Sequence, residues 1–503
     1  MNCKQWKKNL VELSTDSCIE MAIDSNTVIN SMVWKLLEQF SSQIVSFVIS
    51  IILARILMPS DYGIIAIILV FINLAKVIID GGMSTALIQK KNADQIDFST
   101  IFWFCMLLAI ILYTILFFVA PLIAAFYNNE LLKPVLRVLS IIVFFNSFNS
   151  IQRAFVSRHM LFRKLFYVNG IAILVSGIVG IFMAYKGFGV WALVGQSITS
   201  SVVCSIIMWF SVKWRPTFEF SKQRFIGLFD YGWKIFVTEF IIAIYQDIRS
   251  LVIGKVYQPS TLAFFDRGKS LPSLIMSNVT SSINAVLLPT FAEEQDNIVR
   301  VKQMMRRSVQ VSYFFVSPLL VGFFCASKEI VLLLLTEKWL PAVPFIQIFC
   351  IAFLLMPIQN INVTAIKSLG YSSITLKLEI IKKIIEAVIL VISFLINVYA
   401  VAWGIVLYNL ICIFINISPS KRLIHYGWIE QMKDITPTFL AALIMGGFVY
   451  VLKFLPFNIL VILSIQVIIG GFVYYLLVRW FKLESYKYVQ DYFKKILINP
   501  HNH

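Results

Sequence analysis

The sequence is poor in charged residues and lacks any arrangement typical of a metal site. Only 14% of its 503 residues are charged, whereas a soluble globular chain carries about 25%. Its four histidines, His159, His425, His501 and His503, are not spaced as metal ligands. The seven cysteines are scattered, without CxxC or other paired spacing, which favours small apolar residues in helix interiors. We therefore expect no metal ion or other cofactor.

Motifs for nucleotide binding and covalent catalysis are also missing. The sequence contains no Walker A loop, no Asp-x-Asp motif and no Gly-x-Ser-x-Gly motif. The glycine-rich stretch GFGVWALVG (187–195) follows an apolar run rather than a strand, so it does not predict a dinucleotide site. The polar joints between apolar runs are too short for a catalytic domain, which needs about 50 residues or more. We expect a protein that is not an enzyme.

Apolar sequence, in contrast, is abundant. Hydrophobic residues make up 59% of the chain, and its mean hydropathy is +0.83. Apolar stretches long enough to span a bilayer, about 20 residues each, recur between residues 28 and 480. Lipid offers the backbone no hydrogen-bond partners, so such stretches form helices. The sequence predicts an all-α polytopic membrane protein with about fourteen transmembrane helices, of which those near residues 144 and 276 are the most polar.

Lysine and arginine are concentrated in alternate loops. The N-terminal segment, the 88–97, 213–224 and 300–307 loops and the C-terminal tail are rich in them, whereas the opposite loops hold scattered cations such as Arg55 and Lys255. Cationic loops remain in the cytoplasm, so both termini are expected there. The net charge of +17 then reflects these loops, and no nucleic-acid partner is expected.

The two halves of the chain resemble each other. VWKLLEQF (33–40) is matched by GWKIFVTEF (232–240), and ARILMPS (54–60) is matched by GKVYQPS (254–260). Each of the latter stretches places a cation four residues before a Pro-Ser corner. The paired residues are Arg55 with Lys255 and Pro59 with Pro259, followed in order by Pro134 with Pro341, Lys164 with Lys377 and Trp191 with Trp403.

This order predicts a parallel repeat of two six-helix bundles. The bundles are expected over 28–224 and 225–430, after a cytoplasmic extension over 1–27 and before two further helices with a basic tail over 431–503. At the first corner, Pro59 is expected to start the turn and Gly63 to release the second helix. Arg55 is interpreted as an interfacial anchor or as a contact to substrate at the rim, and both corners as hinge points.

Polar residues recur at helical spacing on one face of the first span and on the matching face of the seventh. Faces of this kind have no reason to contact lipid, so they are expected to line a polar interior. The residues are Lys35, Gln39, Ser42 and Ser46 in the first span and Lys234, Thr238, Tyr245 and Arg249 in the seventh.

Several charged residues lie inside apolar stretches, where each costs about 2.5–3.5 kcal/mol unless it is paired or hydrated. Helical spacing predicts pairs between Lys76 and Asp80, between Lys35 and Glu38, between Glu379 and Lys383 and between Lys382 and Glu386. Structural ion pairs and direct function both remain open for these. The cluster FDRGK (265–269), with Asp266, Arg267 and Lys269, is interpreted as a phosphate site or as an interfacial cluster.

Four stretches together resemble a known family. They are WKLLEQFSSQIVSFVISIILARILMPSDYGIIAIILVF (34–71), DGGMSTALIQKKNADQIDFSTIFW (80–103), FGVWALVGQ (188–196) and TEKWLPAVPFIQIF (336–349). They resemble the polysaccharide flippases of the multidrug/oligosaccharidyl-lipid/polysaccharide exporter superfamily, in particular the WzxC-like branch of colanic-acid and teichuronic-acid exporters. One departure is Asp266, which stands where that family usually has asparagine.

The resemblance implies alternating access that moves polyprenyl-diphosphate-linked oligosaccharide across the bacterial cytoplasmic membrane. Implied partners are this substrate, membrane lipids, a proton or sodium coupling ion and polysaccharide polymerase machinery. The carboxylates considered for ion coupling are Asp80, Glu239, Asp247 and Asp266. A multidrug antiporter of the same superfamily, or a membrane polysaccharide polymerase or glycosyltransferase, remains the alternative.

Overall fold

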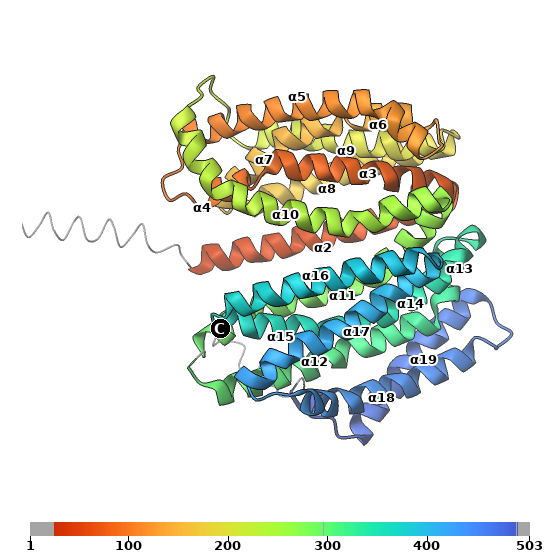
Figure 1. The fold of residues 1–503 in the computed structure, drawn as a ribbon. Helices are drawn as coiled ribbons and strands as arrows, with labels where there is room; N and C mark the ends of the chain where they lie inside the picture. Colours follow the sequence, from red (N-terminus) through yellow and green to blue (C-terminus); the bar gives the residue numbers. More distant parts are fainter. Residues whose placement is uncertain (1–24, 295, 489, 491–503) are drawn as a thin grey trace, which may run out of the picture. The chain divides into compact units, whose positions relative to one another are not determined.

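The computed structural model describes residues 25–294, 296–488 and 490. Most of the predicted N-terminal extension and the end of the tail lie outside these residues. The described chain forms two compact units, which divide at Pro259. The first unit contains α2 (Ser25–Ile56), α3 (Pro59–Asp80), α4 (Met83–Gln89), α5 (Gln95–Phe126), α6 (Leu132–Leu139), α7 (Ile142–Arg158), α8 (Phe162–Tyr185), α9 (Val190–Ser211) and α10 (Lys222–Val256) (Figure 1).

The described elements of the second unit are also helices. Its elements are α11 (Pro259–Glu293), α12 (Ile298–Cys325), α13 (Ser327–Leu334), the 3-10 helix η1 (Glu337–Ala342), α14 (Val343–Leu354), α15 (Met356–Ser368), α16 (Ser372–Phe394), α17 (Val398–Leu423), α18 (Trp428–Leu452) and α19 (Ile459–Trp480). The prediction of an all-α membrane protein is therefore confirmed.

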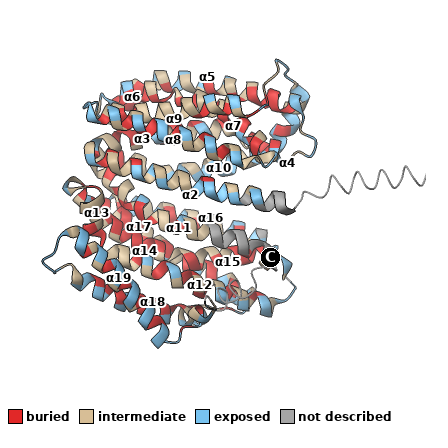
Figure 2. Cartoon of the chain, turned by 180° about the vertical axis from the view of Figure 1, so that it is seen from behind, coloured by how far each residue is buried: buried red, intermediate tan, exposed pale blue. Residues whose placement is uncertain are grey.

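Within the described residues, eleven helical segments are long and apolar enough to cross a membrane. Helices α10, α11 and α16 are also long, with 35, 35 and 23 residues, but are not among the eleven. All three carry charged residues along their length, and each charge lowers the mean hydropathy of a segment. The expected number of fourteen stays a prediction. Figure 2 shows buried residues gathered between the helices and exposed ones on the outer faces.

Helix α10 packs inside the first unit, against α3, α4 and α5, while α2 packs mainly against α8. The contact with α3 and α4 occurs where Gly81 and Gly82, both with positive φ, separate these two helices. A Cβ atom on Gly82 would lie 2.2 Å from the carbonyl oxygen of Gly232 in α10. Glycine is therefore required at position 82 both for its φ of +70° and for the close approach of two backbones. The predicted division into six-helix bundles over 28–224 and 225–430 stays a prediction.

The first corner differs in one detail from the prediction. Helix α3 begins at Pro59, with Met58 as its N-cap residue, because proline is favoured at the first helical position. Gly63 thus lies inside α3 rather than releasing it, and it is buried. A Cβ atom on Gly63 would lie 1.8 Å from the carbonyl oxygen of Pro259, so the two predicted corners touch each other.

The segment that joins α9 to α10 is bound to the start of α5. Backbone groups of Thr217 and Ser221 donate to the hydroxyls of Ser99 and Thr100, at 3.0 and 3.2 Å. Beside them, Lys90 donates to both carboxylate oxygens of Asp97 at 2.7 Å, and the Asp97 side chain is fully buried. These contacts fix the path of the chain into α10.

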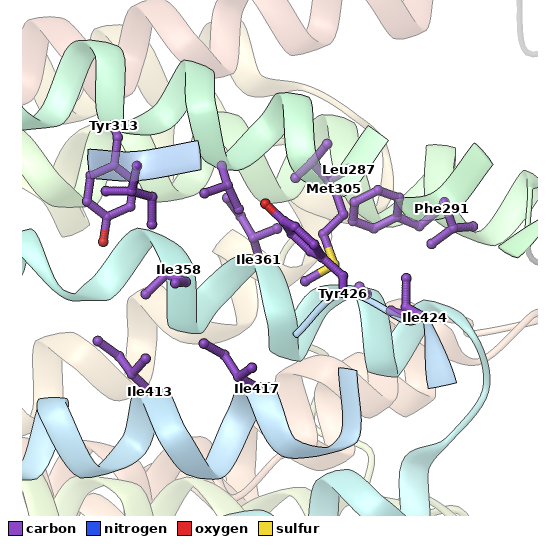
Figure 3. Close-up of a cluster of buried hydrophobic side chains, with 14 residues drawn as sticks. Leu287, Phe291, Met305, Tyr313, Ile358, Ile361, Ile413, Ile417, Ile424 and Tyr426 are labelled. Carbon is purple, nitrogen blue, oxygen red and sulfur yellow. The ribbon is translucent and has the colours of Figure 1, made fainter. Parts of the chain in front are cut away.

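In the second unit, α12 packs along α18 and α16 packs along α17. Figure 3 shows the cluster in which Ile358 and Ile361 of α15 meet Ile413 and Ile417 of α17. Near the start of α11, Gly268 packs directly on α14, since a Cβ atom there would lie 2.3 Å from the Cβ of Phe345. This contact holds the FDRGK segment against the second bundle.

Candidate functional site

A polar cavity of about 480 Å³ lies within the first unit, at the break between α3 and α4. Gly81 and Gly82 interrupt the helix at this point. Polar residues at the end of α3 and in α4 line the cavity together with residues of α7 and α10. The lining includes Lys76, Asp80, Ser84, Thr85, Asn146, Asn149, Ser150, Arg153, Ser157 and Glu239. The cavity therefore joins two carboxylates, Asp80 and Glu239, that the sequence proposed separately for ion coupling.

Asp80 accepts a hydrogen bond from the hydroxyl of Ser150, which also bonds Ser84 at 2.7 Å. A serine hydroxyl has a single proton. Since Ser150 gives its proton to Asp80, Ser84 must be the donor in the second bond. Lys76 and Arg153 are the cations that act on the Asp80 carboxylate. Besides Lys76, which the sequence paired with Asp80, Arg153 of α7 thus also acts on this carboxylate.

A second hydrogen-bond chain runs from Arg153 to α2. Arg153 donates to the side-chain oxygen of Asn169 at 3.0 Å, and the Asn169 amide donates to Glu38 at 2.7 Å. Glu38 in turn accepts from Lys35 at 2.7 Å, as its spacing predicted. A buried carboxylate requires such partners, because an isolated charge is strongly unfavourable away from water. This series of hydrogen bonds links the polar cavity to the predicted stripe on α2.

The other polar residues of the predicted α2 stripe differ in how far their side chains are exposed. Gln39 and Ser46 are exposed, and Ser42 is half-buried. The hydroxyl oxygen of Ser42 is buried and has no hydrogen-bond partner among the described residues. A polar group in that position is satisfied by water or by a ligand.

On α10, the stripe is exposed near its start and half-buried farther along. Lys234 and Thr238 are exposed, and the Thr238 hydroxyl donates to the carbonyl of Lys234 at 3.0 Å. Tyr245, Asp247 and Arg249 are half-buried. Of the α10 residues proposed for function, only Glu239 lines the polar cavity.

The cluster Asp266, Arg267 and Lys269 lies near the start of α11, as predicted, with all three residues half-buried. The Arg267 guanidinium lies 5.3 Å from the centre of the Trp339 ring, which is fully buried. Stacking on tryptophan orients a guanidinium without consuming its hydrogen-bond donors. The candidate cluster FDRGK therefore meets, at this contact, the stretch TEKWLPAVPFIQIF, which carries part of the family resemblance.

At the corners, Arg55 is exposed, whereas Pro59 is buried beside Gly63. Lys255 donates to the carbonyl of Phe126 at the end of α5 and lies 4.5 Å from its ring centre. Next to it, the Tyr127 hydroxyl donates to the Leu251 carbonyl at 3.1 Å, and burial raises the pKa of Tyr127 to about 12. The end of α10 is thus held to α5 by two side chains.

In the second unit, the charges of α16 pair differently from the prediction. Lys382 contacts Glu379 at 2.5 Å and Lys383 contacts Glu386 at 2.8 Å, so both ion pairs use a spacing of three rather than four. Either spacing brings side chains together on a helix. Lys382 and Glu386 are the buried members of their pairs.

The second unit also contains an apolar groove of about 570 Å³ between α12, α18 and α19. Phe315 and Leu319 of α12 line it, together with Val449 of α18 and Val467 of α19. Because these side chains are apolar, the groove could accommodate a hydrocarbon chain.

Sequence reasoning missed the contribution of α7 to the polar cavity. Asn146, Ser150, Arg153 and Ser157 lie at intervals of three or four residues, with Asn149 three residues after Asn146, which is the spacing of one helix face. The signal was the polarity of the span near residue 144, one of the two most polar predicted spans. The pairing of Glu38 with Asn169 carried no local signal, because the two residues lie far apart in sequence.

Comparison with known proteins agrees with this fold. The chain is 22% identical over 417 residues to the succinoglycan biosynthesis transport protein ExoT of Rhizobium meliloti, covering 82% of each chain. It is 24% identical over 311 residues to the lipopolysaccharide biosynthesis protein WzxC of Escherichia coli, covering 61% of this chain and 63% of the relative.

Solved structures show the same architecture. The inward closed conformation of the lipid II flippase MurJ matches with a TM-score of 0.73 at 16% identity, covering 90% of this chain and 98% of MurJ. An inward-facing multidrug resistance MATE transporter of the MOP superfamily matches with a TM-score of 0.59 at 14% identity, covering 78% and 98%. Both likenesses concern the fold, and they confirm its predicted class.

A family model described as "Polysaccharide biosynthesis protein" matches residues 52–344, more than half of the chain. The match includes the α2–α3 corner, the polar cavity and the Arg267–Trp339 contact. The resemblance predicted from the motifs is therefore confirmed: this chain belongs to the polysaccharide biosynthesis protein family.

Proposed function

We propose that this protein is a flippase that moves polyprenyl-diphosphate-linked oligosaccharide across the bacterial cytoplasmic membrane by alternating access. The main support is the family membership, together with relatives named as a succinoglycan transport protein and a lipopolysaccharide biosynthesis protein. A charged, hydrated headgroup cannot cross about 30 Å of hydrocarbon unaided. Polar and cationic faces inside membrane-spanning helices lower that barrier. The protein acts as a transporter and not as an enzyme.

Different features suit the two ends of such a substrate. The diphosphate requires cations, and Arg249 and Arg267 are the arginines of the predicted cavity residues, with Lys35, Lys234 and Lys269 as further cations. Arg267 is held in place by Trp339. The polyprenyl chain requires apolar surface, which the groove between α12, α18 and α19 offers.

We assign ion coupling to Asp80 with Glu239, because both line one polar cavity next to Lys76 and Arg153. Asp247 and Asp266 remain alternatives. Both termini are placed in the cytoplasm by the charge of the loops, and the product is passed to polysaccharide polymerase machinery on the outer side.

The arginine assignment is tested by alanine substitution in a host that lacks the wild-type gene. Arg249→Ala and Arg267→Ala are each expected to reduce polymer export at least tenfold while the protein remains in the membrane, since a charge-assisted phosphate contact contributes about 1.5–3 kcal/mol. Arg267→Lys is expected to recover only part of the export, because lysine lacks the planar group that stacks on Trp339.

Arg300→Ala is the matched control. Arg300 is 62% exposed and pairs with Glu294 at the start of α12, so its removal is expected to leave export unchanged. Normal export by both Arg249→Ala and Arg267→Ala would refute the assignment. Ion-coupled drug resistance without any effect on polymer export would support the multidrug antiporter instead.

A further inference from the structure

The polar cavity in the first unit has a composition that neither the diphosphate nor the polyprenyl chain explains. Its lining carries two cations, Lys76 and Arg153, and two acids, Asp80 and Glu239, so it is balanced in charge. A diphosphate would be repelled by the acids, and a hydrocarbon chain would desolvate all four charges. A coupling ion at Asp80 and Glu239 accounts for the acids but fills little of the volume, so the rest of the cavity is available to a different part of the substrate.

Uncharged hydrogen-bonding groups make up most of the remaining lining. Asn146, Asn149, Ser84, Thr85 and Ser157 together offer both donors and acceptors. Among the residues that the structure describes, no group of three or more His, Cys, Asp or Glu side chains could hold a metal ion. Side chains that both donate and accept hydrogen bonds are complementary to the hydroxyl groups of a ligand, because each hydroxyl also both donates and accepts.

Two atoms in this lining have hydrogen-bonding capacity to spare. Asn149 is only 5% exposed, yet its side-chain carbonyl oxygen accepts no hydrogen bond from the described residues. Ser84 donates its single proton to Ser150, so its oxygen lone pairs are available to an incoming donor. A buried acceptor without a partner costs about 1–3 kcal/mol, which a bound hydroxyl would recover.

Apolar groups complete the lining. Ile88 of α4 and Ile235 of α10 face the same cavity as the polar residues, together with Val77 of α3. A sugar ring combines hydroxyl groups with faces of C–H bonds, and so needs this combination. The volume of about 480 Å³ lies within the range of small-molecule sites, roughly 300–1,000 Å³.

We propose that the cavity between α3, α4, α7 and α10 binds uncharged sugar residues of the transported oligosaccharide. This inference rests on the proposed function. It separates the recognition of the glycan, in the first unit, from the recognition of the diphosphate by arginine. Asn149 and Ser84 accept hydrogen bonds from sugar hydroxyls, while Arg153 and Asn146 donate to sugar oxygens.

The test uses the purified full-length protein and the variants Asn149→Ala and Ser84→Ala. Thr114→Val is the control, since the exposed Thr114 hydroxyl donates to the Ile110 carbonyl of its own helix, at 2.8 Å, and Thr114 lies outside the cavity. Binding is measured with two probes, bare undecaprenyl diphosphate and the lipid-linked oligosaccharide extracted from the polymer-producing host. Each variant is expected to bind the oligosaccharide about tenfold more weakly than wild type and the bare diphosphate equally well. Unchanged melting temperatures without ligand establish that both variants fold.

The other outcomes are distinguishable. If the wild type binds and moves neither probe, the proposed function fails. If the wild type moves the oligosaccharide, and both variants bind and move it equally well, the function stands and the sugar site is refuted. If sodium raises the melting temperature of the wild type but not of Ser84→Ala, while the oligosaccharide affects both alike, the cavity is a cation site and the sugar assignment is overturned.

Discussion

A Gly63→Ala variant is expected to lose polymer export and to melt well below the wild-type protein. The added Cβ atom would lie 1.8 Å from the carbonyl oxygen of Pro259 and 2.8 Å from its Cα, both backbone atoms that no rotamer change can move. Overpacking of a side chain already costs about 1–3 kcal/mol, and here the whole Pro259 corner must shift. The measurement is the melting temperature in detergent, together with export in a host that lacks the wild-type gene.

Gly170→Ala is the control for this variant. Gly170 lies in α8, and apart from its chain neighbours and the backbone of its own helix no heavy atom lies within 4 Å of the position that a Cβ would take. Alanine there is expected to be neutral or to stabilise the helix by roughly 0.5–1 kcal/mol. If Gly63→Ala melts and exports like Gly170→Ala, the contact between the two corners does not exist in the folded protein.

The contact between Gly63 and Pro259 shows how much of the structure could be predicted from the internal repeat of the sequence. Comparison of the two halves paired Pro59 with Pro259 and predicted that both corners matter to the architecture. It did not predict that the corners touch, because a repeat states which positions are equivalent and not which are neighbours. The close approach depends on Gly63, whose role was instead interpreted as starting a helix.

Only part of the polar cavity and its surroundings could be predicted from the sequence, for a similar reason. Helical spacing is a local signal, so the stripes on α2 and α10 and the pairing of Lys35 with Glu38 were accessible from the sequence. The cavity of Asp80 and Glu239 depends on a helix break at Gly81 and Gly82 and on the packing of α10 against it. Such packing is set by tertiary contacts, for which one sequence without relatives contains no direct signal.

Asp97→Ala is expected to destabilise the first unit by about 1–3 kcal/mol. The carboxylate is fully buried and accepts two bonds of 2.7 Å from Lys90, and it also accepts the backbone N–H of Asp94 at 3.1 Å. Removing it leaves the Lys90 ammonium and a helix N-terminus without their acceptor. The expected cost is lower than for a fully buried pair, because the Lys90 side chain is 36% exposed and water can solvate its charge.

A graded series separates charge from hydrogen bonding at this position. Asp97→Asn keeps an oxygen for the Asp94 N–H but loses the charge, so it is expected to melt between wild type and Asp97→Ala. The double variant Lys90→Met, Asp97→Leu removes both charges and is expected to regain part of the loss, since apolar replacement of a buried pair is often neutral. Glu130→Ala, at an exposed acid, should lie within about 0.5 kcal/mol of wild type. If Asp97→Ala melts like Glu130→Ala, the pair contributes nothing to the fold; if the double variant melts below Asp97→Ala, the cost lies in lost hydrogen bonds rather than in an unpaired charge.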